Sequence, residues 1–108
     1  MDRMRLLLLP LLALPLAAAA PDGRIIAEHG NGSGGMACVT CHGENFRGNA
    51  AIGAPALAGL PASEILARLA HFAGPDGHNA MMRAVALGLD PGERQAVAAY
   101  LASLKRVP

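Results

Sequence analysis

The stretch Cys38-Val39-Thr40-Cys41-His42 decides how this chain is interpreted. Two thiols stand three positions apart, and an imidazole follows the second thiol directly. In this C-x-x-C-H pattern the thiols can add to the two vinyl groups along one side of a porphyrin, and the imidazole is then held beneath the iron. We therefore predict one covalently bound haem c, with Cys38 and Cys41 as its thioether links and His42 as the proximal iron ligand.

Three other interpretations of the motif fit the chain less well. A thioredoxin-like redox pair needs a β-α-β setting, and no part of the sequence has a clear strand pattern. A structural zinc site needs four ligands, and it would have to recruit another histidine beside the adjacent Cys41 and His42, which fit a tetrahedron poorly. A plain disulfide would leave His42 without a role.

Length and composition exclude several other classes of protein. The chain has 108 residues, enough for one domain, and a formal net charge of +1 provides no basic surface for nucleic acid. Two cysteines cannot form a disulfide-rich scaffold. Because the chain has two phenylalanines, one tyrosine and no tryptophan, few large side chains are available for a core. A large apolar cofactor would fill the volume that the small residues leave.

Residues 1–20 have the pattern of a secretory signal. A short charged region precedes an apolar stretch, and the alanines at 17–20 supply the small residues that a signal peptidase needs. A membrane anchor is the rival interpretation, but the apolar stretch contains two prolines and is shorter than the roughly 20 residues that a spanning helix needs. We predict cleavage after Ala20, a functional domain at 21–108, and a periplasmic protein without a stable membrane anchor.

The domain is predicted to be all-α, with three or four helices joined by long loops. Apolar periodicity and helix-start signals indicate helices at 22–29, from Pro61 to about residue 73, at 80–87, and from Asp90 onward. The last helix has the clearest start, because Asp90-Pro91-Gly92-Glu93 supplies an N-cap, a proline at N1 and an acid at N3. No window of the sequence alternates between apolar and polar residues as a strand would.

A low-spin haem electron carrier needs a sixth iron ligand, which is usually methionine or histidine. Met36 lies too close to Cys38 to reach the opposite face of the ring. Met81 and Met82 stand about forty residues downstream, which is enough chain to pass around the edge of the ring. His78 is the competing ligand. We expect a methionine, because a soft thioether ligand is typical of such carriers.

Several short motifs resemble those of small bacterial class I cytochromes c and occur in that family's order. They are residues 38–43, Pro55–Gly59, Asn79–Met82 and Asp90–Tyr100. The resemblance extends over nearly all of 21–108. It implies a helical fold wrapped around one haem, in which the first and last helices cross. It also implies that a glycine of the first helix, here Gly23, meets an aromatic residue of the last, here Tyr100.

The resemblance also implies roles for residues around the iron. The carbonyl of Pro55 would accept the ring N–H of His42, which fixes the imidazole tautomer and raises its basicity. The family's axial methionine stands a fixed short distance before the leucine that precedes the last helix. Counted back from Leu89, this implies Met82 as the distal ligand; Met81 is the second choice and would otherwise pack near the haem edge.

The function that follows is the transfer of single electrons between redox partner proteins, a donor dehydrogenase or complex and an acceptor oxidase or reductase. The sequence contains no catalytic triad, phosphate-binding loop or pair of carboxylates that would indicate an enzyme. Two alternatives stay open: a cytochrome subunit of a periplasmic dehydrogenase complex, and a haem sensor or peroxidase-like domain with a labile sixth ligand, in which His78 or Arg83 would face a ligand pocket. Mitochondrial-type members of the family carry a ring of lysines, but this chain has only Lys105, so docking is expected to depend on apolar contact.

Overall fold

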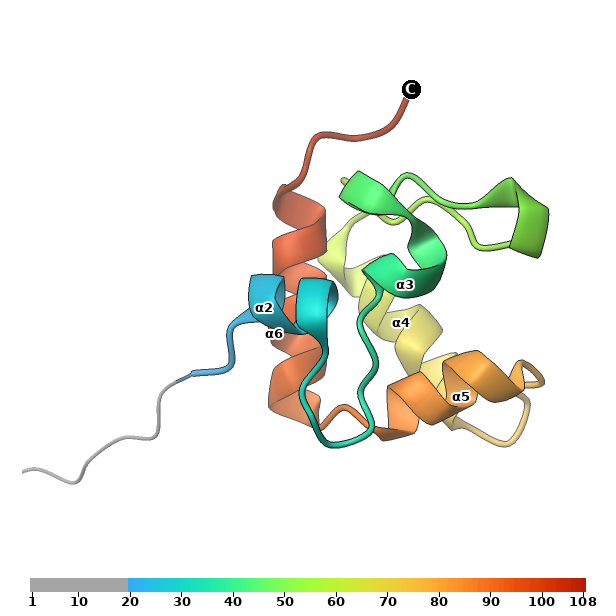
Figure 1. Cartoon of the computed structure of the whole chain (residues 1–108). Helices are drawn as coiled ribbons and strands as arrows, with labels where there is room; N and C mark the ends of the chain where they lie inside the picture. The colour runs from blue at the N-terminus through green and yellow to red at the C-terminus, as the bar shows by residue number, and fades with distance from the viewer. Residues whose placement is uncertain (1–19) are drawn as a thin grey trace, which may run out of the picture.

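The computed structural model of the protein describes residues 20–108. The predicted secretory signal at 1–20 lies outside the described residues, apart from Ala20. The described range contains five α-helices and two 3₁₀ turns: α2 (Gly23–His29), α3 (Val39–His42), η1 (Glu44–Phe46), η2 (Ala50–Ile52), α4 (Ala62–Ala73), α5 (Ala80–Leu87) and α6 (Pro91–Ser103) (Figure 1). Within this range the only strand-like pairing is an isolated bridge between Asn49 and Ala54. The prediction of an all-α domain is confirmed.

The helix boundaries follow from local capping. The Asp22 carboxylate accepts hydrogen bonds from the first turn of α2, and Gly30 ends that helix with φ of 80°. At the start of α6, Asp90 and Glu93 form the expected capping box. The described residues hold one helix more than the three or four expected, because the haem motif itself winds into the single turn α3. No helix between residues 20 and 108 is both long and apolar enough to cross a membrane.

The first and last helices, α2 and α6, cross in close contact (Figure 1). Gly23 makes this possible, because a Cβ there would overlap the carbonyl oxygen of Ala96. The crossing of the first and last helices is therefore confirmed, and the part of α6 nearest to Gly23 is the backbone of Ala96 and Val97. The ring of Tyr100 packs edge-on against Phe46, with ring centroids 6.0 Å apart.

Helix α5 packs against α4, and two arginines fix its position. The guanidinium of Arg83 donates to the carbonyl oxygens of Ala73 and Gly74, where α4 ends. The guanidinium of Arg94 donates through Nε and Nη2 to the carbonyl oxygen of Ala86, at 3.1 and 2.7 Å. Both arginines satisfy carbonyl groups that a helix end leaves without intrahelical partners. As a result, the helix that carries Met82 is held against α4 and the start of α6.

Candidate functional site

A cavity among the described residues has a volume of about 430 Å³, within the usual range of cofactor pockets, roughly 300–1,000 Å³. Helices α4, α5 and α6 line it with apolar side chains, among them Ile65, Leu69, Phe72, Val85, Val97 and Leu101. Most of these residues also belong to the hydrophobic core. The core of the domain therefore surrounds a space that the polypeptide does not fill.

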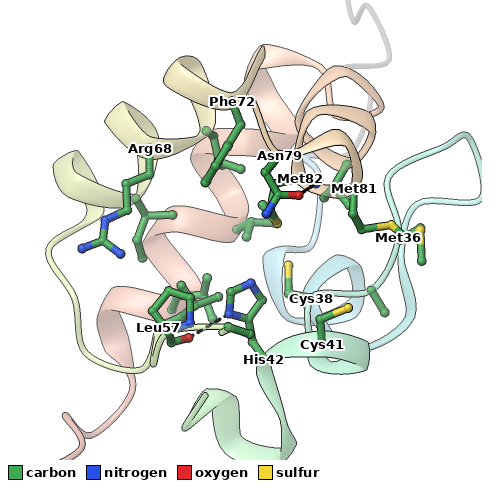
Figure 2. A pocket seen from close by; sticks show the side chains of 18 of the residues that line it. Met36, Cys38, Cys41, His42, Leu57, Arg68, Phe72, Asn79, Met81 and Met82 are labelled. Carbon is green, nitrogen blue, oxygen red and sulfur yellow. Dashed lines mark hydrogen bonds between the residues drawn. The ribbon is translucent and has the colours of Figure 1, made fainter. Parts of the chain in front are cut away.

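His42 lies on one wall of this cavity and is the one buried polar side chain between residues 20 and 108, with 6% of its surface exposed. Its Nδ1 lies 2.8 Å from the carbonyl oxygen of Pro55. Because a carbonyl oxygen can only accept, Nδ1 carries a proton, and in the neutral imidazole Nε2 is then the nitrogen with the free lone pair. Figure 2 shows this second ring nitrogen directed into the cavity. The hydrogen bond that the resemblance implied is thus present, and it leaves Nε2 able to bind a metal.

The backbone around His42 holds Pro55 in place. The carbonyl oxygen of Phe46 accepts hydrogen bonds from Leu57 at 2.9 Å and Ala58 at 3.1 Å, which ties the segment after Pro55 to the loop that follows α3. Asn45 and Phe46 adopt left-handed φ values of 58° and 57°. Such a conformation costs roughly 1–3 kcal/mol for a residue with a bulky side chain and persists only where the surroundings enforce it. Here the strained turn directs the Phe46 carbonyl toward the segment that positions the histidine.

Cys38 and Cys41 line the cavity beside His42, and both are free thiols (Figure 2). Burial raises the pKa of the Cys38 thiol to about 11, so this position favours an uncharged sulfur, which a thioether is. In the described part of the chain, no group of three His, Cys, Asp or Glu side chains gathers into a cluster that could hold a metal ion.

Met82 lies across the cavity from His42, near the start of α5 (Figure 2). Asn79 caps this helix, and its Oδ1 accepts a hydrogen bond from the backbone N–H of Met82 at 3.0 Å. Met81 and Met36 also line the cavity, but they lie 52% and 42% exposed. Met82 is partly buried and packs against the core. Of the methionines on the wall, Met82 is the one enclosed by protein.

Two groups weighed as alternatives do not line the cavity. His78 is exposed and is absent from the cavity wall. Arg83 is also absent from the wall, because its guanidinium is bound to the carbonyl oxygens at the end of α4. The structure thus brings together Cys38, Cys41, His42 and Met82 but leaves out His78 and Arg83.

The sequence interpretation gave no role to two polar residues of the wall, Arg68 and Asn79. Arg68 is the only Lys, Arg, Asp or Glu side chain that lines the cavity, and its Nη2 lies 2.9 Å from Glu64 Oε1. A signal was present, since Arg68 lies three residues after Ile65 and four before Phe72, on the apolar stripe of α4. The Arg68 side chain is 44% exposed, so its charge lies where the wall of the cavity meets solvent.

The residues present fit a haem. Two sulfurs and an imidazole lie together on one wall, a thioether lies on the other, and the space between them has mostly apolar walls. A planar apolar ring with iron at its centre and acidic groups at one edge matches these walls together with the single cation of Arg68.

Comparison with known proteins gives a consistent result. The sequence model of the family Cytochrome c matches residues 27–105. The chain is 38% identical over 94 residues to the thiosulfate dehydrogenase electron acceptor of Stutzerimonas stutzeri (strain A1501), an alignment that covers 86% of this chain and 44% of that protein. The chain thus spans less than half the length of the curated relatives it matches.

Solved structures show the same fold. The reduced recombinant cytochrome c4 from Pseudomonas stutzeri superposes with a TM-score of 0.70 and 31% identity, covering 80% of this chain and 48% of that one. The thiosulfate dehydrogenase TsdBA from Marichromatium purpuratum superposes with a TM-score of 0.68 and 35% identity, covering 80% of this chain and 20% of that one.

Proposed function

Since the chain belongs to the cytochrome c family and its cofactor is one covalent haem c, we propose that it carries single electrons between redox partner proteins through an iron ligated by His42 and Met82. One observation carries this proposal. An imidazole whose Nδ1 is bound to the Pro55 carbonyl presents its free nitrogen to an apolar cavity, with a thioether on the opposite wall. In this proposal Cys38 and Cys41 form the thioether links.

Each residue of the site has a physical task in this function. The Pro55 carbonyl fixes the His42 tautomer and raises the basicity of Nε2. The apolar side chains of α4 and α6 exclude water, and the Met82 thioether favours the reduced state. Arg68 offers a cation to the acidic groups of the cofactor. When bound, the haem supplies the one-electron Fe(III)/Fe(II) couple.

The mouth of the cavity suits a partner with an apolar docking surface. Met36, Ile52 and Met81 line the cavity and are 42%, 61% and 52% exposed. Exposed apolar side chains that cluster around one opening are typical of interaction sites. The proposed donor is a dehydrogenase of the thiosulfate dehydrogenase class, which the name of the 38% identical relative supports. The proposed location is the periplasm, on the evidence of the predicted signal at 1–20.

A second candidate function is that of a cytochrome subunit within a dehydrogenase complex. The likeness to part of TsdBA, of which this chain covers 20%, favours it. The sensor or peroxidase-like alternative has less support, because it needs a polar group facing an open iron position and neither His78 nor Arg83 lines the cavity.

The test is reduction of the purified ferric holoprotein by a thiosulfate dehydrogenase supplied with thiosulfate, followed by absorption in a stopped-flow instrument. We expect full reduction that depends on both the enzyme and thiosulfate, and an intact mass equal to the mature polypeptide plus one haem. Co-purification of the chain with an endogenous dehydrogenase would favour the second candidate function, a cytochrome subunit of a dehydrogenase complex. A protein that no donor reduces, and whose ferrous form rapidly binds carbon monoxide at neutral pH, would be a sensor and not a carrier.

A further inference from the structure

The side chain of Asn31 links two segments that lie far apart in the sequence. Asn31 belongs to the loop between α2 and α3, ahead of Cys38. Its amide nitrogen donates to the carbonyl oxygen of Gly88 at 2.7 Å and to Glu93 Oε1 at 3.1 Å. In Figure 1 the loop reaches the connection between α5 and α6. Asn31 therefore joins the segment that leads into the haem motif to the end of the helix that carries Met82.

Every hydrogen-bonding position of this amide is used. Its Oδ1 accepts from the backbone N–H groups of Ser33 at 2.8 Å and Gly35 at 2.9 Å. An amide offers two donors and two acceptor positions, so the four bonds of Asn31 saturate it. The loop folds around one side of the amide while the other side binds the far segment. The orientation of the amide is thereby fixed from both ends.

The backbone at this junction packs too closely to admit a side chain. A Cβ at Gly88 would overlap the carbonyl carbon of Gly34. A Cβ at Gly35 would lie 2.6 Å from Leu89 Cδ2. Two glycine backbones are thus in direct contact beside the Asn31 amide. Glycines bury little apolar surface, so at this junction the polar link adds to the contact that the buried Leu89 makes beside Gly35.

The other polar contacts of α5 come from its own side of the cavity. Arg83 binds the end of α4, and Arg94 reaches α5 from α6. Among residues 20–108, the bond from Asn31 to Gly88 is the one hydrogen bond that ties the segment before Cys38 to α5 or its cap. It is the polar link between the chain on the histidine side and the chain on the methionine side.

We propose that Asn31 is a positioning residue for the distal iron ligand: by tying Gly88 to the loop before the haem motif, it keeps α5, and with it Met82, closed against the haem. The proposal rests on the ligation by Met82 proposed above. Removal of the amide donors leaves the Gly88 carbonyl without this partner and frees the end of α5 to move outward. Met82 then leaves the iron more often, although it does not touch Asn31.

The test compares Asn31→Ala and Asn31→Asp with Asn49→Ala in the holoprotein. Asn31→Asp keeps an oxygen that can accept from Ser33 and Gly35, removes the donors and places a carboxylate beside Glu93 Oε1. It serves as the second variant if Asn31→Ala fails to fold. Asn49 is a matched control, because its Oδ1 caps only the short turn η2 by accepting from Ala51 at 3.1 Å.

Two quantities are measured: the rate at which added imidazole displaces the thioether from the ferric iron, and the hydrogen-exchange protection of each helix. Loss of a partly buried hydrogen-bond pair should speed displacement about tenfold in both Asn31 variants relative to Asn49→Ala. Protection of the α5 amides should fall by a similar factor, while protection in α4 stays unchanged.

Equal rates of thioether displacement in the Asn31 and Asn49 variants would overturn the proposal. A loss of hydrogen-exchange protection spread evenly over all helices would also overturn it, because Asn31 would then stabilise the whole fold and not α5 in particular. A wild-type protein that lacks the thioether-to-iron absorption band would overturn the ligation by Met82 and this proposal with it. A wild-type protein with the band, but without faster displacement in the Asn31 variants, would overturn this proposal alone.

Discussion

The contact between the first and last helices allows a sharp test of how the fold is held. Gly23 stands at the start of α2, and a Cβ there would overlap the carbonyl group of Ala96 in α6. Because the obstacle is backbone and not the end of a flexible side chain, α2 must move away from α6 to accommodate it. We predict that Gly23→Ala destabilises the holoprotein.

The size of the effect follows from the contacts that α2 makes. Overpacking costs about 1–3 kcal/mol, and the higher helix propensity of alanine offsets at most about 1 kcal/mol of it. The shift also loosens Ile26 and Ala27, which are buried in the core, and a gap of roughly 0.5–1 Å forfeits a quarter to a half of their dispersion energy. A net loss of about 2 kcal/mol lowers the melting temperature by about 8–16 °C in a domain of this size.

The assay is thermal unfolding of the holoprotein followed by far-ultraviolet circular dichroism, with Gly92→Ala as the matched control. Gly92 lies in the first turn of α6, and a Cβ there would meet only Asp90 Oδ1 at 3.4 Å and Pro21 Cγ at 3.8 Å, which is ordinary contact. Alanine at this position should therefore be neutral or slightly stabilising. If Gly23→Ala had the same melting temperature as Gly92→Ala, helices α2 and α6 would not be in close contact at Gly23, and the reasoning would be refuted.

Three further predictions concern the haem site. Met82→Ala should leave one side of the iron open, so that the ferrous protein binds carbon monoxide rapidly and the reduction potential falls, whereas Met81→Ala should keep the wild-type spectrum; the reverse pattern would make Met81 the ligand. Arg68→Gln removes the one Lys or Arg side chain on the cavity wall, and because a cation favours the less positive ferrous state, redox titration should show a potential lower by roughly 10–40 mV. An unchanged or higher potential would place the Arg68 charge away from the haem. The rate of reduction by the partner should vary little with ionic strength, because the cavity mouth is apolar; a steep decrease with salt would indicate a charged docking surface.

The sequence was sufficient to predict those features of the structure that depend only on residues close together in the chain. The helix at Asp90 begins where its capping box predicts, since the carboxylates of Asp90 and Glu93 bind backbone groups within the same turn. The haem motif is informative for the same reason, because its three side chains are brought together by one turn of chain. The choice of Met82 as the proposed ligand on the far side needed the resemblance as well, since spacing alone left Met81, Met82 and His78 open.

The residues that the sequence interpretation missed are those whose role comes from distant partners. Asn31 stands in a glycine-rich loop that composition marks as flexible, yet it binds Gly88 and Glu93 across the fold. Gly23 was expected at the helix crossing, but the sequence did not show that the backbone of Ala96 is its nearest neighbour there. No local pattern encodes which carbonyl group a remote side chain will reach, because that depends on how the helices pack after they form.

The scarcity of large side chains and the presence of the cavity have one physical cause. Val97 and Leu101 are the largest fully buried side chains in the described part of the chain, and both also line the cavity. Ile65 and Leu69, which complete the core from α4, line it too. The inner faces of α4 and α6 thus have part of their packing surface turned toward the cavity and not toward another helix. For this domain, burial of the cofactor and formation of the hydrophobic core are the same event, so the contacts that stabilise the fold are also those that keep water from the iron. A covalent link suits such a domain, because a haem that could leave would expose the apolar side chains that line its cavity.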